Sequence, residues 1–113
     1  MNEENAVDIS VIDTLKGLMK DRFSFLIDTF INKTATQIED LKSAVSNNDT
    51  DTIISITHAM KGSSGSVGAV TVHKLSKTYE DNARSGEFDG ADNWPDLLEA
   101  EYNRYKDEIQ NHL

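Results

Sequence analysis

The sequence IISITHAMKGSSGSVGA, which occupies residues 53–69, decides how the whole chain is interpreted. Counted at about 100° per residue, its apolar side chains fall within an arc of about 60° on one side of a helix. These side chains are Ile53, Ile56, Met60 and Val67. The spacing therefore predicts a helix that turns this side toward a hydrophobic core.

His58 lies on the outer side of this predicted helix, at about 140° in the same count and nearly opposite the apolar side. Four neighbours share that outer surface: Ile54, Lys61, Gly62 and Gly65. Each glycine costs a helix roughly 0.5–1 kcal/mol relative to alanine, so we expect the pair to clear space for the backbone of a second protein. An imidazole in this position is accessible to the active site of another protein, whereas a core histidine is not.

Residues 62–68, GSSGSVG, also have the composition of a flexible loop, and propensity alone slightly favours a loop over a helix there. An exposed histidine is in most proteins only a solvated side chain. Periodicity therefore suggests a functional role for His58 without assigning one, and both interpretations of residues 62–68 remain open on these grounds.

Apolar residues recur at steps of three and four on the N-terminal side of this stretch, which is typical of amphipathic helices. We expect a short helix over residues 9–19, with Asp8 or Ser10 as its N-cap and Gly17 loosening or ending it. A long helix follows over residues 21–45, and its length of about 38 Å sets the length of the molecule.

Turn residues separate the remaining helices. The tract NNDTD at residues 47–51 predicts a turn with several N-cap candidates, and Gly86 predicts the end of a helix over residues 72–83. After the longest loop, Pro95 opens the last helix, whose apolar stripe extends to Ile109. No region alternates apolar and polar residues long enough to form a strand. The predicted fold class is all-α, an antiparallel up-and-down four-helix bundle with an additional short N-terminal helix.

Composition limits the function classes. The 113 residues suit a single domain, 1–113, in which we expect residues 1–7 to be flexible. The formal net charge of −9 argues against binding to nucleic acid or to an anionic membrane, because both need clustered basic residues. The chain has no cysteine, which excludes disulfides and thiolate metal sites.

The same sequence features bear on location and metals. The first fifteen residues are acidic and lack a continuous apolar run, and no apolar stretch approaches the roughly 20 residues of a membrane span, so we expect a cytoplasmic protein. The three histidines lack any recognised ligand spacing, so no metal site is predicted. His73 and His112 are expected to be ordinary surface residues.

Residues 58–69, HAMKGSSGSVGA, closely resemble the signature of the histidine-containing phosphotransfer (HPt) family, His-x-Leu-Lys-Gly-Ser-Ser-x-x-x-Gly-Ala. The likeness extends along most of the chain, from residues 15–19 to the stretch YEDNARSG at residues 79–86. Met60 stands where leucine is usual, a conservative departure because methionine fills a similar core volume. The resemblance implies that the signature is helical, which favours the helical interpretation of residues 62–65.

The resemblance also implies a function. His58 would accept a phosphoryl group from the aspartyl phosphate of a receiver domain and pass it to an aspartate of another, in a multistep phosphorelay of two-component signalling. The expected partners are receiver domains of a hybrid sensor kinase and of response regulators, and the chain is expected to be a stand-alone monomer. No cofactor is expected, since the receiver would supply Mg²⁺, and the chain alone would have no enzymatic turnover.

Further residues take roles from the same resemblance. Lys61 would neutralise part of the phosphoryl charge. Glu80 matches a position where family members often carry a polar residue that hydrogen-bonds the imidazole, and Arg84, one turn beyond, would bind phosphate or steer an acidic receiver. Ile54, Gly62 and Gly65 would form the receiver-docking surface. Ser64 is expected to be structural, with its small side chain permitting close packing.

Two other function classes compete with this one. A histidine-kinase fragment would need a nucleotide-binding domain, for which the chain has no room, and Ala59 follows His58 where kinases typically have an acidic residue. A helical adaptor or inhibitor would dock on a signalling partner without carrying phosphate, using Ile54, Gly62 and Gly65. The sequence does not identify the donor kinase, the acceptor regulator, the direction of phosphoryl flow or the physiological output.

Overall fold

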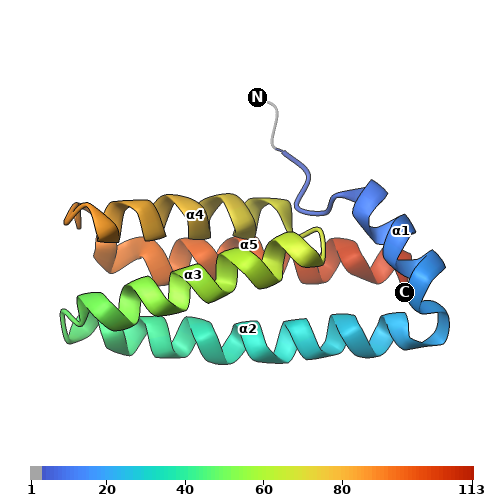
Figure 1. The fold of residues 1–113 in the computed structure, drawn as a ribbon, viewed down its shortest axis with the longest axis horizontal. Helices are drawn as coiled ribbons and strands as arrows, with labels where there is room; N and C mark the ends of the chain where they lie inside the picture. The colour runs from blue at the N-terminus through green and yellow to red at the C-terminus, as the bar shows by residue number, and fades with distance from the viewer. Residues whose placement is uncertain (1–3) are drawn as a thin grey trace.

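Five α-helices and three short 3₁₀ turns make up the computed structural model, which describes residues 4–113. The α-helices are α1 (Ile9–Met19), α2 (Phe23–Ser46), α3 (Thr50–Ser66), α4 (Val70–Arg84) and α5 (Trp94–Ile109). The 3₁₀ turns are Lys20–Arg22, Ala91–Asn93 and Gln110–His112. Figure 1 shows α2 running the length of the molecule with α4 on the opposite side, α3 crossing obliquely between them, and α1 at one end of the bundle.

Helices α2 to α5 pack as an antiparallel bundle in which each helix contacts the next and α5 closes against α2. Within residues 4–113 there is no strand, only an isolated pairing of Val7 with Ala69. The predicted all-α four-helix bundle with an additional N-terminal helix is thus confirmed. The helical interpretation of residues 62–65 is confirmed too, because α3 continues to Ser66.

Helices α3 and α4 end in the same tight reversal, which helps neighbours in sequence to run antiparallel. After α4, Gly86 has a φ of 75°, and the amide of Glu87 donates to the carbonyl of Asn82 at 2.8 Å. After α3, Gly68 has a φ of 68°, and the amide of Ala69 donates to the carbonyl of Ser64 at 2.9 Å. Such left-handed residues satisfy the last helical carbonyls while turning the chain back.

Aspartates cap two helix starts at predicted positions. Asp8 accepts the amides of Ser10 at 3.0 Å and Val11 at 3.4 Å at the start of α1, and Asp49 accepts the amide of Thr52 at 3.2 Å at the start of α3. Gly17, by contrast, does not end α1, which continues for two more residues to Met19. The break comes instead at the C-cap residue, Lys20, whose φ is 52°.

The core lies between α2, α3, α4 and α5. Tyr79 and Trp94 stack with ring centroids 4.7 Å apart. The hydroxyl of Tyr105 donates to the carbonyl of Val67 at 2.8 Å, and that of Tyr102 to the carbonyl of Ile31, also at 2.8 Å. Helix α5 is therefore hydrogen-bonded to the end of α3 and to α2.

The segment before α1 differs from the expectation that residues 1–7 are flexible. Residues 1–3 lie outside the described residues. Ala6 and Val7, however, are buried, and the amide of Val70 donates to the carbonyl of Ala6 at 3.0 Å. The amide of Asp8 donates to the carbonyl of Gly68 at 2.8 Å. The expectation is wrong at Ala6 and Val7 because their side chains join the core and their backbone pairs with the α3–α4 turn.

No helix within residues 4–113 combines the length and apolar composition needed to cross a bilayer.

Candidate functional site

His58 lies on the outer face of α3 beside α4, and its side chain is 64% exposed. Its Nδ1 atom is 3.0 Å from Oε2 of Glu80, which reaches across from α4. The predicted outward direction of His58 agrees with this exposure. The predicted contact between the imidazole and Glu80 is present as well.

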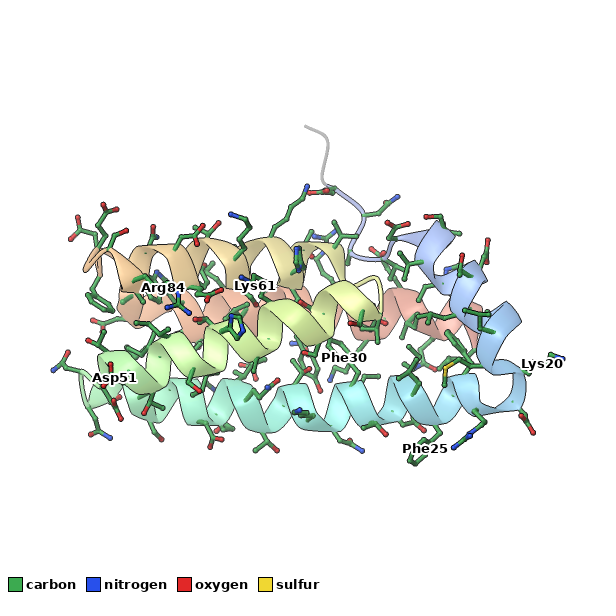
Figure 2. All side chains as sticks on the ribbon, in the orientation of Figure 1. Lys20, Phe25, Phe30, Asp51, Lys61 and Arg84 are labelled. Atoms are coloured by element: carbon green, nitrogen blue, oxygen red, sulfur yellow. The ribbon has the colours of Figure 1, made fainter. Side chains whose placement is uncertain are left out.

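Glu80 is the centre of the site. Its side chain is only 3% exposed, and its two oxygens contact three residues. The ammonium of Lys61 lies 2.7 Å from Oε1, while Nε and Nη2 of Arg84 donate to Oε2 at 3.0 and 2.8 Å. Figure 2 shows Lys61 and Arg84 close to each other at the seam between α3 and α4.

These contacts keep the buried carboxylate ionised. The Lys61 ammonium, with smaller contributions from Arg84 and His58, lowers the pKa of Glu80 from its usual value of 4.5 to about 2, against the opposing effect of burial. With His58 neutral, the two cations and one carboxylate sum to a local charge of +1. The site is therefore locally positive on a chain whose net charge is −9.

The ionised Glu80 determines which imidazole nitrogen is available. A carboxylate only accepts hydrogen bonds, so the Nδ1 atom facing it must carry the proton. In the neutral ring the lone pair then resides on Nε2. The arrangement presents a nucleophilic nitrogen on an exposed side chain, next to two cations that favour an approaching anion.

Lys61 and Arg84 occupy their predicted neighbourhood, with one difference. Lys61 is expected to neutralise a phosphoryl group and Arg84 to bind phosphate or steer an acidic receiver, and the structure shows both cations bound to Glu80. Lys61 is three residues after His58 and Arg84 four residues after Glu80, the spacings that place side chains together on a helix surface.

The structure agrees with the predicted docking surface at Gly62 but not at Gly65 or Ile54. A Cβ atom added at Gly62 would meet nothing within 4 Å, so the expected clearing exists there. A Cβ added at Gly65 would lie 3.1 Å from Nδ1 of His73. The prediction of an open space at Gly65 is therefore wrong, because the His73 ring occupies it. Ile54, expected to be exposed, is half-buried and packs against the core. Ser64 is fully buried, and its hydroxyl donates to the carbonyl of Met60 at 2.5 Å.

His73 is the residue near the site that the sequence interpretation missed. It was expected to be an ordinary surface residue, but it is half-buried and its Nδ1 lies 2.8 Å from the carbonyl oxygen of Lys61. Helical counting along α4 offered a signal, because His73 and Glu80 are seven residues, about two turns, apart and share one face. Within residues 4–113, no group of three or more His, Cys, Asp or Glu side chains is arranged to hold a metal ion.

An exposed imidazole on an antiparallel four-helix bundle, backed by a buried carboxylate and two cations, defines a class of protein: a helical bundle that presents a histidine at its surface. Comparison with known families makes this specific. The family model of the Hpt domain matches residues 26–108, and the chain belongs to this family.

The structure is also similar to the crystal structure of histidine-containing phosphotransfer protein B (HptB) from Pseudomonas aeruginosa PAO1. The TM-score is 0.87 at 28% sequence identity, over 96% of this chain and 98% of that chain. No curated protein matches the chain in sequence. Family membership gives the chain a histidine phosphotransfer role in phosphorelay signalling, with receiver domains of two-component systems as its kind of interaction partner.

Proposed function

We propose that His58 is the residue that carries the phosphoryl group, accepting it from a receiver-domain aspartate and passing it to the aspartate of a second receiver. The observation that supports this most is the bond between His58 Nδ1 and Oε2 of Glu80, which leaves the lone pair on Nε2 of an exposed ring. The local charge of +1 would attract the dianionic phosphoryl group to this site, although the chain as a whole is acidic.

The transfer balances as an in-line displacement at phosphorus. Nε2 of His58 supplies the electron pair for the new N–P bond, and the O–P bond of the aspartyl phosphate breaks, with its electron pair returning to the receiver's carboxylate. The Nδ1 proton stays in the bond to Glu80, so the positive charge on the phosphorylated ring lies next to a carboxylate. Donation to the second receiver is the same displacement in reverse.

Magnesium belongs to the receiver in this proposal. Both oxygens of Glu80, the one buried carboxylate among the described residues, already face Lys61, Arg84 and His58. No carboxylate of the site is therefore left to bind a divalent cation. We accordingly propose that the chain has no cofactor and no turnover of its own, and that it works as a monomer between receivers of a hybrid sensor kinase and of response regulators.

Phosphoryl uptake is the test of this function. The protein is mixed with a ³²P-phosphorylated receiver, and we expect label that is acid-labile and alkali-stable, as phosphohistidine is. His58→Gln is expected to take up none. Incubation with ATP alone is expected to give no label, since self-labelling would indicate a kinase. Stable binding of the receiver without any uptake of label would favour the adaptor function instead.

A further inference from the structure

A second histidine connects α4 to α3 close to the site. Nδ1 of His73 is 2.8 Å from the backbone carbonyl oxygen of Lys61, and a carbonyl only accepts, so the imidazole donates this bond. His73 belongs to the first turns of α4, whereas Lys61 lies in the second half of α3. The bond therefore joins two helices that run in opposite directions, at the residue three positions after His58.

Gly65 makes room for this bond. A Cβ atom at position 65 would stand 3.1 Å from Nδ1 and 3.4 Å from Cε1 of His73. The separation from Nδ1 is tighter than ordinary van der Waals contact, so a side chain at position 65 would require the His73 ring to shift by a few tenths of an ångström. The glycine at position 65 and the histidine at position 73 thus form a matched pair across the seam.

Lys61 is consequently fixed to α4 at both ends. Its carbonyl is held by His73, and its ammonium lies 2.7 Å from Oε1 of Glu80. His73 and Glu80 are about two turns apart on one face of α4, and Lys61 spans the distance between them. In addition to the packing of α3 against α4, these two contacts oppose both rotation of α3 and its displacement along α4.

We propose that His73 is a positioning residue for phosphotransfer: its bond to the Lys61 carbonyl, seated on Gly65, holds α3 so that the His58 imidazole and the Glu80 carboxylate meet in the reactive arrangement. The proposal rests on the proposed function of His58. It assigns His73 no contact with phosphate or receiver.

Variants at position 73 separate positioning from simple packing. His73→Asn keeps an N–H donor at about the position of Nδ1, whereas His73→Leu keeps the bulk and loses the donor. We expect His73→Leu to slow transfer about tenfold, because misplacing a reacting group by about 1 Å costs up to about a hundredfold, and His73→Asn to restore most of the rate. Equal rates for all three proteins would overturn the proposal.

The tautomer of His58 gives a readout that a merely structural role would not change. The ring ¹⁵N chemical shifts are expected to show an Nδ1–H tautomer in the wild type and in His73→Asn, and a mixture of tautomers in His73→Leu. Ile109→Val serves as a control that lowers stability far from the seam; it should leave the tautomer and the rate unchanged. A pure Nδ1–H tautomer in folded His73→Leu would contradict the proposal.

A double-mutant cycle at positions 65 and 73 measures whether the two residues act together. Gly65→Ala is expected to slow transfer in the wild type by displacing the imidazole, and to have no further effect in His73→Ala, where the space is vacant. An equal loss in both backgrounds would mean that Gly65 serves receiver docking and would refute the pairing. If the wild type takes up no label, the proposed function fails, while the tautomer measurement still decides the role of His73.

Discussion

Glu80 is a buried carboxylate at a protein surface, and its charge organises the residues around it. At 3% exposure the ionised group would be costly without partners, yet Lys61, Arg84 and His58 each supply a donor. The carboxylate in turn fixes the tautomer of His58. A single residue thus stabilises the seam and directs the nucleophilic nitrogen outward.

Replacing Glu80 by glutamine, which has nearly the same shape, removes the negative charge and so tests what the charge contributes to stability and to transfer. We expect Glu80→Gln to cost about 1–2 kcal/mol of unfolding free energy, because two cations lose a charged acceptor, and to slow transfer about tenfold as the tautomer becomes mixed. Urea unfolding and single-turnover transfer measure the two effects. Glu80→Asp, which keeps the charge on a shorter side chain, is the control and should retain the Nδ1–H tautomer in part. A wild-type rate for Glu80→Gln would contradict the role given to the carboxylate.

The lowered pKa of Glu80 also predicts how stability depends on pH. A folded pKa of about 2 against a usual value of 4.5 means that the folded state releases the proton more readily than the unfolded state. The stabilisation is therefore complete above about pH 4.5 and is lost as the pH falls toward 2. The unfolding free energies of wild type and Glu80→Gln, measured from pH 7 to pH 3, should converge as acid is added. If the two unfolding free energies differed by the same amount at every pH, the ionised Glu80 carboxylate would not be the source of the stabilisation.

At the residue scale the sequence predicted part of the site. The outward direction of His58 follows from the spacing of apolar residues on its own helix, and the contact with Glu80 followed from family resemblance. The ring of His73 against Gly65 was missed because counting along one helix does not say which side chains of a neighbouring helix reach it. Sequence alone therefore predicts that Gly65 leaves space for a partner protein, whereas in the structure it leaves space for the His73 ring.

Helix α3 shows how tertiary packing overrides local propensity. Residues 62–65 favour a loop in isolation, yet they are helical because Met60 and Ser64 on the same helix, and Val67 at its C-cap, are buried in the bundle. The helix ends where Gly68 adopts a left-handed conformation. Glycines inside and just beyond this element thus have different roles, and substitutions distinguish them.

Gly62 should tolerate a side chain within the protein but not at the interface. Nothing lies within 4 Å of a Cβ added there, and glutamine is a better helix former than glycine. We therefore expect Gly62→Gln to leave stability unchanged or slightly raised while reducing the rate of phosphoryl transfer, since the side chain fills the space a receiver needs. Thermal unfolding and transfer kinetics test this together. Unimpaired transfer would show that Gly62 is not part of the docking surface.

Any side chain at Gly68 should destabilise the fold. Its φ is 68°, and a Cβ there would lie 3.1 Å from the carbonyl oxygen of Asp8 and 3.3 Å from Cβ of Val11. We expect Gly68→Ala to lower the unfolding free energy by about 1–3 kcal/mol, as strained backbone positions do. Chemical denaturation measures this cost, with Gly17→Ala in the last turn of α1 as a matched control that should not destabilise. Equal effects of the two substitutions would contradict the described α3–α4 turn.

At the scale of the whole molecule the bundle could be predicted because four long amphipathic stretches leave few other ways to bury their apolar faces. The attachment of Ala6 and Val7 could not, since two apolar residues are too few to show a period and their burial depends on the α3–α4 turn far along the chain. The bundle places His58 at the seam between α3 and α4, beside the ion pair of Lys61 with Glu80. A locally positive site on an acidic protein results.

The central claim is that Glu80 makes Nε2 of His58 the atom that carries the phosphoryl group. The most direct measurement is NMR of the protein after phosphotransfer from a receiver, in which ³¹P–¹⁵N coupling identifies the bonded nitrogen. We expect one phosphorylated nitrogen, Nε2 of His58, with Nδ1 still protonated. Phosphate on Nδ1 of His58, or on another residue, would contradict it.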